Sequence, residues 1–394
     1  MKTSHATVLA LILAFVAVDA PSMAAGGSTC VVNQSLTKQT IRGFGGSSAW
    51  HGQLSVSEAD ALFTTIGLSI LRVRVDPDGL WSDEIANAQL AQARGAIVIA
   101  SPWSPPAAMK DNGSTINGSL LPAHYGDYVN WLNSFASNIP GLYAVSVQNE
   151  PNLQPAYESC GWTEPQLFDF IVNFGHLFSA RLMMPETFNY LPTYVDSVLS
   201  NATGAANTAI CAYHWYGANQ NKLWTQAYNL GKDIWMTEHF SNDQTLGGAI
   251  STALDIHKQL TINFANAYVW WWVREPSCNI IDAGGSPIHV RGYVMGQYAK
   301  FVRPGSVRVD ATGGASGLSI SAFVNAGKLV IVAVNNGNNS ITQAFSVLNG
   351  TATSVTPYTT AATKSMLAGT AINVVNGQFS ATMEKKSVTT FVEN

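Results

Sequence analysis

The segment Gly141-Leu-Tyr-Ala-Val-Ser-Val-Gln148 is an apolar run that Asn149, Glu150 and Pro151 follow directly. A short, nearly continuous apolar run that ends at turn residues is typical of a strand covered on both faces. Eight such runs cover residues 39–44, 70–75, 96–100, 141–148, 183–185, 209–214, 232–237 and 266–272. The amphipathic stretches between them include residues 56–66, 84–92, 125–139, 163–182 and 250–260. Eight strands joined by helical crossovers predict an α/β fold, a closed (β/α)8 barrel of parallel strands.

Polar residues gather where these predicted strands end. They are Ser101, Asn149, Glu150, His214 and Glu238. Barrel enzymes carry their active sites at the carboxyl ends of the strands. We therefore expect these side chains to meet at one mouth of the barrel.

Two of these residues are glutamates in matching contexts. Glu238 ends the run Ile-Trp-Met-Thr-Glu238-His239-Phe240, 88 residues after Glu150. Cleavage of a glycosidic bond needs two carboxyl groups, because one protonates the leaving oxygen while the other attacks the anomeric carbon or activates a water. Asn149, beside the first acid, suits a hydrogen bond to a sugar 2-hydroxyl, a contact that strengthens in the transition state. The alternative is that both glutamates are ordinary loop acids.

The composition favours a neutral polymer as the binding partner. Charged residues make up 11% of the chain, against roughly 25% in an average globular protein. The chain has 11 Trp and 13 Tyr, and its net charge is −4. A nucleic-acid binder would need a basic surface, so this class is excluded. We expect a monomer that binds neither nucleic acid nor a membrane.

Aromatic residues near the strand ends are candidates for sugar contacts. Pyranose rings present C–H faces that pack against Trp and Tyr side chains, whose apolar faces are large. The candidates are Trp50, Trp81, Trp103, Tyr157, Trp162 and either Trp270 or Trp271. Of these we select Trp50, Trp103, Tyr157 and Trp270 as substrate-binding residues. Core packing is the commoner role of a tryptophan, but motif residues flank Trp50 and Trp103 and favour the binding role.

The two ends of the chain differ from the barrel pattern. Residues 1–24 carry Lys2, an apolar run and small residues at 22–24, which predicts a signal peptide and an exported protein. Residues 306–394 contain short alternating runs between Gly- and Asn-rich turns, which predicts a β-sandwich. Residues 25–37 also alternate and could add a strand to that sandwich. The barrel then occupies residues 38–305.

Neither the cysteines nor the short motifs imply a cofactor. Cys30, Cys160, Cys211 and Cys278 form no Cys-x-x-Cys pair, so a structural zinc site is not expected. Cys211 lies in a strand-like run and suits a buried free thiol, while one bridge between Cys160 and Cys278 is compatible with their predicted loops. The chain has no Gly-rich phosphate loop and no His-Glu-x-x-His motif. We expect no metal and no cofactor.

Six short motifs, taken in their order along the chain, resemble those of a known protein family. They are Arg42-Gly-Phe-Gly-Gly, Ser101-Pro-Trp-Ser-Pro-Pro, Gln148-Asn-Glu-Pro, His214-Trp-Tyr-Gly, Trp235-Met-Thr-Glu-His and Lys300-Phe-Val-Arg-Pro-Gly. Together they resemble glycoside hydrolase family 30, and most closely its bacterial xylanases, over nearly the whole chain after the signal peptide. The resemblance implies a barrel with a side β-sandwich, a β-1,4-xylan substrate and retention of the anomeric configuration. It also implies that Glu150 is the acid/base and Glu238 the nucleophile.

The ionised nucleophile needs hydrogen-bond donors. His214 and Tyr216 end the adjacent predicted strand and are the expected suppliers. The alternative for His214 is a core histidine bonded to the backbone. Other readings of the whole chain are a β-1,6-glucanase or an exo-acting xylobiohydrolase of the same family, and a non-catalytic carbohydrate-binding protein.

The sequence departs from the subgroup at one position. Xylanases of this subgroup that require a glucuronic acid branch generally present a basic residue after the eighth strand, where this chain has Glu275. A carboxylate there would repel the glucuronate, so we expect no strict dependence on the branch. Arg274 could take over the role if the loop is shifted, and Arg291 is expected to be structural.

Overall fold

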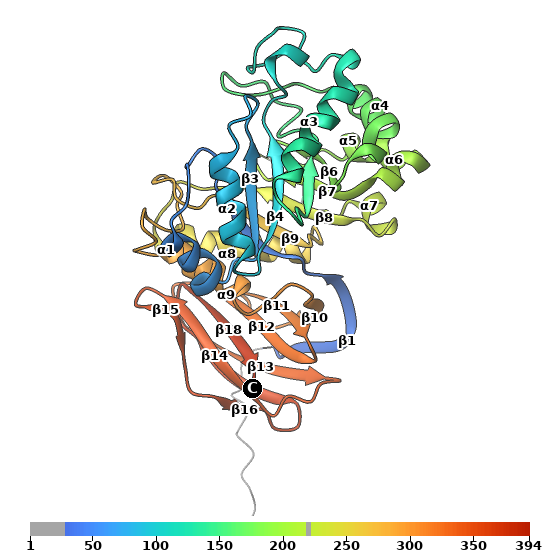
Figure 1. Ribbon diagram of the computed structural model, residues 1–394. Coiled ribbons are helices and arrows are strands. Elements are labelled where there is room, and N and C mark those ends of the chain that lie inside the picture. Colours follow the sequence, from blue (N-terminus) through green and yellow to red (C-terminus); the bar gives the residue numbers. More distant parts are fainter. Residues whose placement is uncertain (1–27, 218–221) are drawn as a thin grey trace, which may run out of the picture.

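The computed structural model describes residues 28–217 and 222–394 and contains a barrel beside a curled β-sheet (Figure 1). The expected signal peptide, residues 1–24, lies outside the described residues. Eight parallel strands close the barrel in sequence order. They are β2 (Gly43–Ser47), β3 (Ile70–Val75), β4 (Ile97–Pro102), β5 (Ala144–Ser146), β6 (Arg181–Thr187), β7 (Thr208–His214), β8 (Asp233–Glu238) and β9 (Ala267–Trp272). The predicted fold class is confirmed.

Helices surround this barrel. They are α1 (Val56–Ala59), which continues as a π-helical segment Asp60–Ile66, α2 (Ser82–Gln92), α3 (Tyr125–Ser137), α4 (Glu164–Phe174), α5 (Pro192–Leu199), α6 (Ala202–Asn207), α7 (Thr225–Asn229), α8 (Leu246–Thr261) and α9 (Val290–Ala299). Short 3-10 turns span Ala107–Met109, Pro122–His124 and Gly175–Leu177. The helix predicted over residues 163–182 was too long, because α4 ends at Phe174 and β6 begins at Arg181. Its start was right, since a capping box between Thr163 and Gln166 fixes the first turn.

The first barrel strand lies later than predicted. Residues 39–40 belong to β1 (Cys30–Thr40), and the barrel begins at β2 with Gly43-Phe-Gly-Gly-Ser. A Cβ atom on Gly45 would lie 2.4 Å from the carbonyl oxygen of Ile70. Only glycine therefore allows β2 to approach β3 this closely.

The N-terminal strand joins the C-terminal sheet, as predicted. β1 pairs with β10 in antiparallel and with β13 in parallel orientation. The sheet runs in the order β15-β14-β18-β12-β11-β10-β1-β13-β17, and β16 pairs with β14. Its further strands are β10 (Val307–Gly313), β11 (Leu318–Asn325), β12 (Lys328–Asn335), β13 (Ile341–Leu348), β14 (Ser354–Ala361), β15 (Lys364–Ala368), β16 (Ile372–Asn373), β17 (Gln378–Met383) and β18 (Ser387–Glu393).

The sheet packs against the barrel through α9 and α8 (Figure 1). The Gln297 side chain donates to Thr360 Oγ1 across 2.8 Å, and the Thr390 hydroxyl donates to the Gln297 carbonyl across 2.8 Å. These groups are buried, so both units share one continuous interface.

All four cysteines are buried and free. The buried thiol predicted at Cys211 is confirmed, whereas the bridge considered between Cys160 and Cys278 does not form. Within the described residues, no helix combines the length and apolar character that a membrane crossing requires.

Candidate active site

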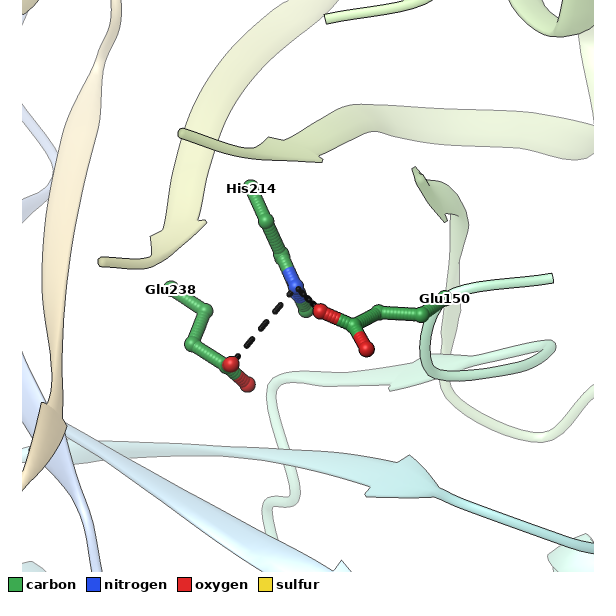
Figure 2. Close-up of side chains that lie close together, drawn as sticks. All are labelled: Glu150, His214 and Glu238. Atoms are coloured by element: carbon green, nitrogen blue, oxygen red, sulfur yellow. Dashed lines mark hydrogen bonds and ion pairs between the residues drawn. The ribbon is translucent and has the colours of Figure 1, made fainter. Parts of the chain in front are cut away.

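Glu150, His214 and Glu238 meet at the carboxyl ends of the barrel strands (Figure 2). Glu150 follows β5, His214 ends β7 and Glu238 ends β8. His214 Nδ1 lies 2.9 Å from Glu150 Oε1 and 3.8 Å from Glu238 Oε1. One carboxylate oxygen of each glutamate and this nitrogen all lie within 4.8 Å of one another. The residues that the motifs singled out are therefore brought together.

Glu150 is held in a strained backbone conformation. Its φ is +49°, in the left-handed region that non-glycine residues rarely adopt. Two backbone hydrogen bonds fix the turn, from Asn149 N to the Pro102 carbonyl at 2.8 Å and from Glu150 N to the Glu186 carbonyl at 2.9 Å. Strain of this kind persists where the surroundings over-determine the position, which is common at active sites.

Glu238 reaches the interior because β8 carries a bulge. Between the pairs Tyr213–Met236 and His214–Glu238, β8 advances two residues while β7 advances one. Trp235 faces the interior and Met236 faces the helices, so regular alternation would turn Thr237 inward and Glu238 away from the barrel axis. Because Thr237 is the extra residue of the bulge, Glu238 takes the inward position instead.

Arg72 holds the nucleophile candidate and was not predicted. Its guanidinium donates to Glu238 Oε2 at 2.6 Å, to Asn149 Oδ1 at 2.7 Å and to Ser101 Oγ at 3.1 Å. The group is fully buried and lies 4.7 Å from the ring centre of Trp103. A charged residue in the middle of the apolar run 70–75 was the signal in the sequence, because a barrel strand buries such a residue only with partners.

Glu186 is a third carboxylate in the site and was also missed. Its Oε1 lies 3.3 Å from Arg72 Nε and 3.7 Å from His214 Nε2. Glu186 is the extra residue of a bulge in β6, between the pairs Pro185–Ala212 and Thr187–Tyr213, and its φ is +53°. Period-two alternation does not reveal a residue that a bulge re-aims.

Burial and the neighbouring charges shift the pKa values of His214, Glu186 and Glu238. Burial lowers the pKa of His214, but the charge of Glu238 and contacts with Glu150 and Glu186 outweigh burial and raise this pKa from 6.5 to about 9. Burial raises the pKa of Glu186, but Arg72 and His214 outweigh it and bring this pKa from 4.5 to about 2. Burial also raises the pKa of Glu238, and His214 and Arg72 oppose that rise. At neutral pH His214 and Arg72 are therefore cations and Glu186 is an anion.

Of the two donors predicted for Glu238, Tyr216 forms the hydrogen bond, whereas His214 hydrogen-bonds to Glu150 and lies 3.8 Å from Glu238 Oε1. The Tyr216 hydroxyl donates to Glu238 Oε1 across 3.0 Å, so Glu238 receives donors on both oxygens, and the Arg72 donor opposes the rise in pKa that burial causes. The oxygen of the Asn149 side chain faces Arg72, and its NH2 group donates to no other described residue. That amide remains available for a ligand hydroxyl. Among the described residues, His214 hydrogen-bonds to the Glu150 side chain and to no backbone group, so the alternative of a core histidine bonded to the backbone was wrong.

The predicted aromatic contacts divide into three groups. Trp50 and Tyr157 are about half exposed, and burial together with the charges of Glu150 and Glu238 raises the pKa of Tyr157 to about 12. Trp103 is buried, with its ring centre 4.7 Å from that of Trp50, and supports the exposed indole. Trp270 is a correction.

Trp270 points out of the barrel. It is fully buried, its Nε1 donates to the Cys278 carbonyl across 2.7 Å, and the Arg291 guanidinium lies 4.6 Å from its ring centre. Val269 faces the interior, so alternation turns Trp270 outward and Trp271 inward. Trp271 then lies 5.5 Å from Trp103 and 5.9 Å from Trp50, between ring centres.

The cations after β9 are both engaged. Arg274 Nη1 lies 2.7 Å from Glu58 Oε1, and Arg274 also donates to the His51 carbonyl. Arg291 is buried and donates to Gln244 Oε1 at 3.0 Å and to the Asp243 carbonyl, which agrees with the expected structural role. Glu275 lies next to Arg274 and is partly exposed.

Glu150, His214 and Glu238 offer ligand atoms in one place, so the chemistry of a bound cation has to be considered. Arg72 already contacts Glu238 Oε2 and supplies positive charge to the site. A protonated His214 has no lone pair for a metal. The donor set therefore suits carboxylate chemistry better than metal binding.

The spacing of the carboxylates decides what they can do. Retaining glycosidases place their carboxyl groups about 5–5.5 Å apart, whereas inverting enzymes leave about 6.5–9.5 Å for a water. Oxygens of Glu150 and Glu238 lie within 4.8 Å. The geometry fits direct attack by one carboxylate.

Comparisons with known proteins agree with this geometry. The chain is 36% identical over 392 residues to glucuronoxylanase XynC of Bacillus subtilis strain 168, covering 93% of this chain and 92% of the relative. Xyn30A of Clostridium acetobutylicum, a glycoside hydrolase family 30 subfamily 8 xylanase, is 38% identical with a TM-score of 0.90, covering 93% of this chain and 99% of that structure. A GH30 endoxylanase of Clostridium papyrosolvens C71 is 38% identical with a TM-score of 0.87, covering 93% and 100%. No protein-family model matches the chain.

Proposed function

Because the chain belongs to glycoside hydrolase family 30, we propose that it is a retaining endo-β-1,4-xylanase with Glu238 as nucleophile and Glu150 as acid/base. The observation that carries the proposal is the pair of carboxylates with oxygens within 4.8 Å at the barrel mouth. The full-length similarity to xylanases supports the substrate.

In the first step, a Glu238 oxygen attacks the anomeric carbon. The bond from this carbon to the leaving xylan oxygen breaks, and Glu150 gives its proton to that oxygen. Arg72 and Tyr216, at 2.6 and 3.0 Å, orient the attacking carboxylate. The products are a glycosyl ester on Glu238 and a shortened chain.

In the second step, the ester is hydrolysed. Glu150 is now a carboxylate, and it takes a proton from a water that attacks the same carbon. The bond to Glu238 breaks, which restores both glutamates and gives net retention. The Asn149 amide donates to the sugar 2-hydroxyl in both transition states, and the half-exposed Trp50 and Tyr157 provide faces for neighbouring sugar units.

We propose that a glucuronic acid branch is accepted but not required. In the sequence, Glu275 stands at the position where the subgroup is expected to present a carboxylate-binding cation. Arg274 is paired with Glu58 and the His51 carbonyl. Using Arg274 for a branch would break this ion pair, so linear xylan is a competent substrate.

Product analysis tests the function. Linear β-1,4-xylan, glucuronoxylan and β-1,6-glucan are digested in parallel, and the new chain ends are followed by NMR within the first minutes. We expect internal cleavage of both xylans, with the β-anomer appearing first. Release of xylobiose alone would indicate an exo enzyme, cleavage of β-1,6-glucan alone the other family activity, and an initial α-anomer an inverting mechanism.

We propose further that the protein is exported and acts as a monomer. The apolar segment within residues 1–24 supports export. Mass analysis of the amino terminus of the mature protein, and its mass in solution, check both statements.

A further inference from the structure

Glu186 is a buried carboxylate in the site that the proposed reaction does not use. Its side chain is fully buried, so it does not reach a substrate. The Ser101 hydroxyl donates to its Oε2 across 2.7 Å, and its Oε1 faces Arg72 Nε at 3.3 Å and His214 Nε2 at 3.7 Å. Its backbone carbonyl accepts the Glu150 amide. Glu186 therefore contacts both cations of the site and the backbone of the acid/base.

The charges of these groups sum to zero in the form that can react. That form has Glu150 protonated, Glu186 and Glu238 ionised, and Arg72 and His214 positively charged. All five side chains are at least nine-tenths buried, so an unbalanced charge would be costly. Without the charge of Glu186, one of the two cations would lack a counter-charge.

The position of His214 matters because the negative charge moves during the reaction. Before attack the charge lies on Glu238, and in the glycosyl-enzyme it lies on Glu150. His214 Nδ1 is 3.8 Å from Glu238 Oε1 and 2.9 Å from Glu150 Oε1 (Figure 2). A cation at this position faces the charged carboxylate in both states.

We propose that Glu186 is a positioning residue that keeps His214 protonated, so that the imidazolium serves as counter-ion to whichever of Glu150 and Glu238 is ionised. The inference rests on the proposed double displacement. Glu186 is then a third carboxylate of the site, which pairs with Arg72 and His214 and does not contact the sugar.

The groups around His214 support this assignment. Facing it are Glu150 from the loop after β5, Glu186 from β6, Glu238 from β8 and the Tyr216 ring at 6.1 Å between ring centres. Within the described part of the chain, His214 Nε2 forms no hydrogen bond, and the carboxylate oxygen that faces it is Glu186 Oε1 at 3.7 Å, which also lies 3.3 Å from Arg72 Nε. The raised pKa of His214 and the lowered pKa of Glu186 agree with this pairing.

The test is the titration of His214 in the full-length protein without substrate. The chain has eight histidines, so a 15N-histidine-labelled sample is followed by NMR and the His214 signals are assigned by their loss in His214→Asn. In the wild-type protein we expect both ring nitrogens to stay protonated past pH 8. In Glu186→Gln the transition should fall by about one pH unit or more, because a counter-charge is lost.

A kinetic measurement on xylan accompanies the titration. We expect the alkaline limb of kcat/KM in Glu186→Gln to move to lower pH by about one unit or more, since the loss of the His214 proton removes the counter-ion. Glu186→Asp keeps the charge and should return both the titration and the limb toward wild type, even at a lower kcat. Ser101→Ala removes a neutral hydrogen bond to the same carboxylate and should leave the His214 transition in place.

Two results would overturn the proposal: a His214 that is neutral in the wild-type protein at pH 7, or a His214 transition that is the same in Glu186→Gln. The first needs no variant, so it decides the question even if Glu186→Gln does not fold. A wild-type protein that leaves xylan intact would instead refute the proposed function, while the titration would still report on Glu186 and His214.

Discussion

Inside the barrel, three strands each carry an apolar residue that is followed two positions later by a polar one. We call Ile70, Ile99 and Ala212 the lower layer, and Arg72, Ser101 and His214 the upper layer. Each pair is separated by two residues, so both members face the interior. All six side chains are fully buried. The side chains of the two layers are thus equally buried, but those of the lower layer are apolar and those of the upper layer are charged or polar.

The two layers stabilise different things. The lower layer gains free energy by removing apolar surface from water, about 25 cal/mol per Å². The upper layer removes charges from water, which is unfavourable unless every charge is paired. Arg72, His214 and the three glutamates meet that condition only together. We infer that the lower layer supports stability and the upper layer serves the reaction.

The largest expected effect comes from the nucleophile. Glu238→Gln should lower kcat on xylan by about 10⁴-fold or more, because no other carboxylate can form the ester. Binding of xylo-oligomers, measured by calorimetry, should remain largely intact. Full turnover by this variant would contradict the role of Glu238 as nucleophile and the catalytic role of the upper layer.

Replacing the acid/base Glu150 should lower the activity by an amount that depends on the leaving group of the substrate. Glu150→Gln should reduce kcat on xylan by about 10²–10⁴-fold, the range for a lost general acid. Aryl xylosides with an activated leaving group need no protonation, so the variant should form the glycosyl-enzyme on them at a substantial rate. An equal loss on both substrates contradicts the role of Glu150.

Truncation of a side chain in the lower layer should reduce stability and leave the pH dependence of the reaction unchanged. Ile99→Ala should reduce the free energy of unfolding by about 2–5 kcal/mol, as measured by urea denaturation. The pH profile of kcat/KM should stay where it is in the wild-type protein. Ile99→Val, which removes one methyl group, is the matched control and should cost about 0.5–1.5 kcal/mol. A shifted pH profile in Ile99→Ala would show that the layers are not separate in function.

Arg274 and Glu275, in the loop after β9, should discriminate weakly between linear and glucuronosyl-branched xylan. A charge-assisted contact is worth roughly 1.5–3 kcal/mol, and we expect none between Glu275 and a glucuronate. The values of kcat/KM on matched linear and glucuronosyl-branched oligomers should agree within about tenfold. A preference for the branch above about a thousandfold would mean that Arg274 leaves Glu58 to bind it, and Arg274→Ala should then abolish the preference.

The smallest effect is the pH dependence of stability. The pKa of His214 is about 9 in the folded protein and 6.5 ordinarily, so its stabilisation is complete below about pH 6.5 and is lost as pH rises through about 9. Glu186, at about 2 instead of 4.5, stabilises above about pH 4.5 and loses this contribution as pH falls through about 2. The Tm of His214→Asn should therefore fall less than that of the wild-type protein between pH 6.5 and 9.

The sequence was sufficient for the barrel, the N-terminal strand of the sandwich and the two glutamates at strand ends. It was not sufficient for the residues that bulges place. Glu186 occupies an extra position in β6, and Thr237 shifts Glu238 to the inner face. Alternation assumes a constant register, so it cannot locate such residues.

Two other errors have different physical causes. Trp270 was chosen from a run of three tryptophans without first fixing which residues of β9 face inward. Arg72 was passed over because the run 70–75 was assigned as apolar, although a buried guanidinium needs partners and so marks a polar site. Both could be found by assigning the face of each strand residue before choosing site residues.

The central claim is that Glu238 forms a covalent glycosyl-enzyme at the barrel mouth. It is tested by incubating the protein with a 2-deoxy-2-fluoro-xylobioside that carries an activated leaving group, followed by proteolysis and mass spectrometry. Fluorine slows both steps, and the leaving group restores the first, so the ester accumulates. We predict one fluoroxylobiosyl adduct, located on Glu238. An adduct on Glu150 or Glu186, or turnover of xylan with inversion and no adduct, would contradict the account.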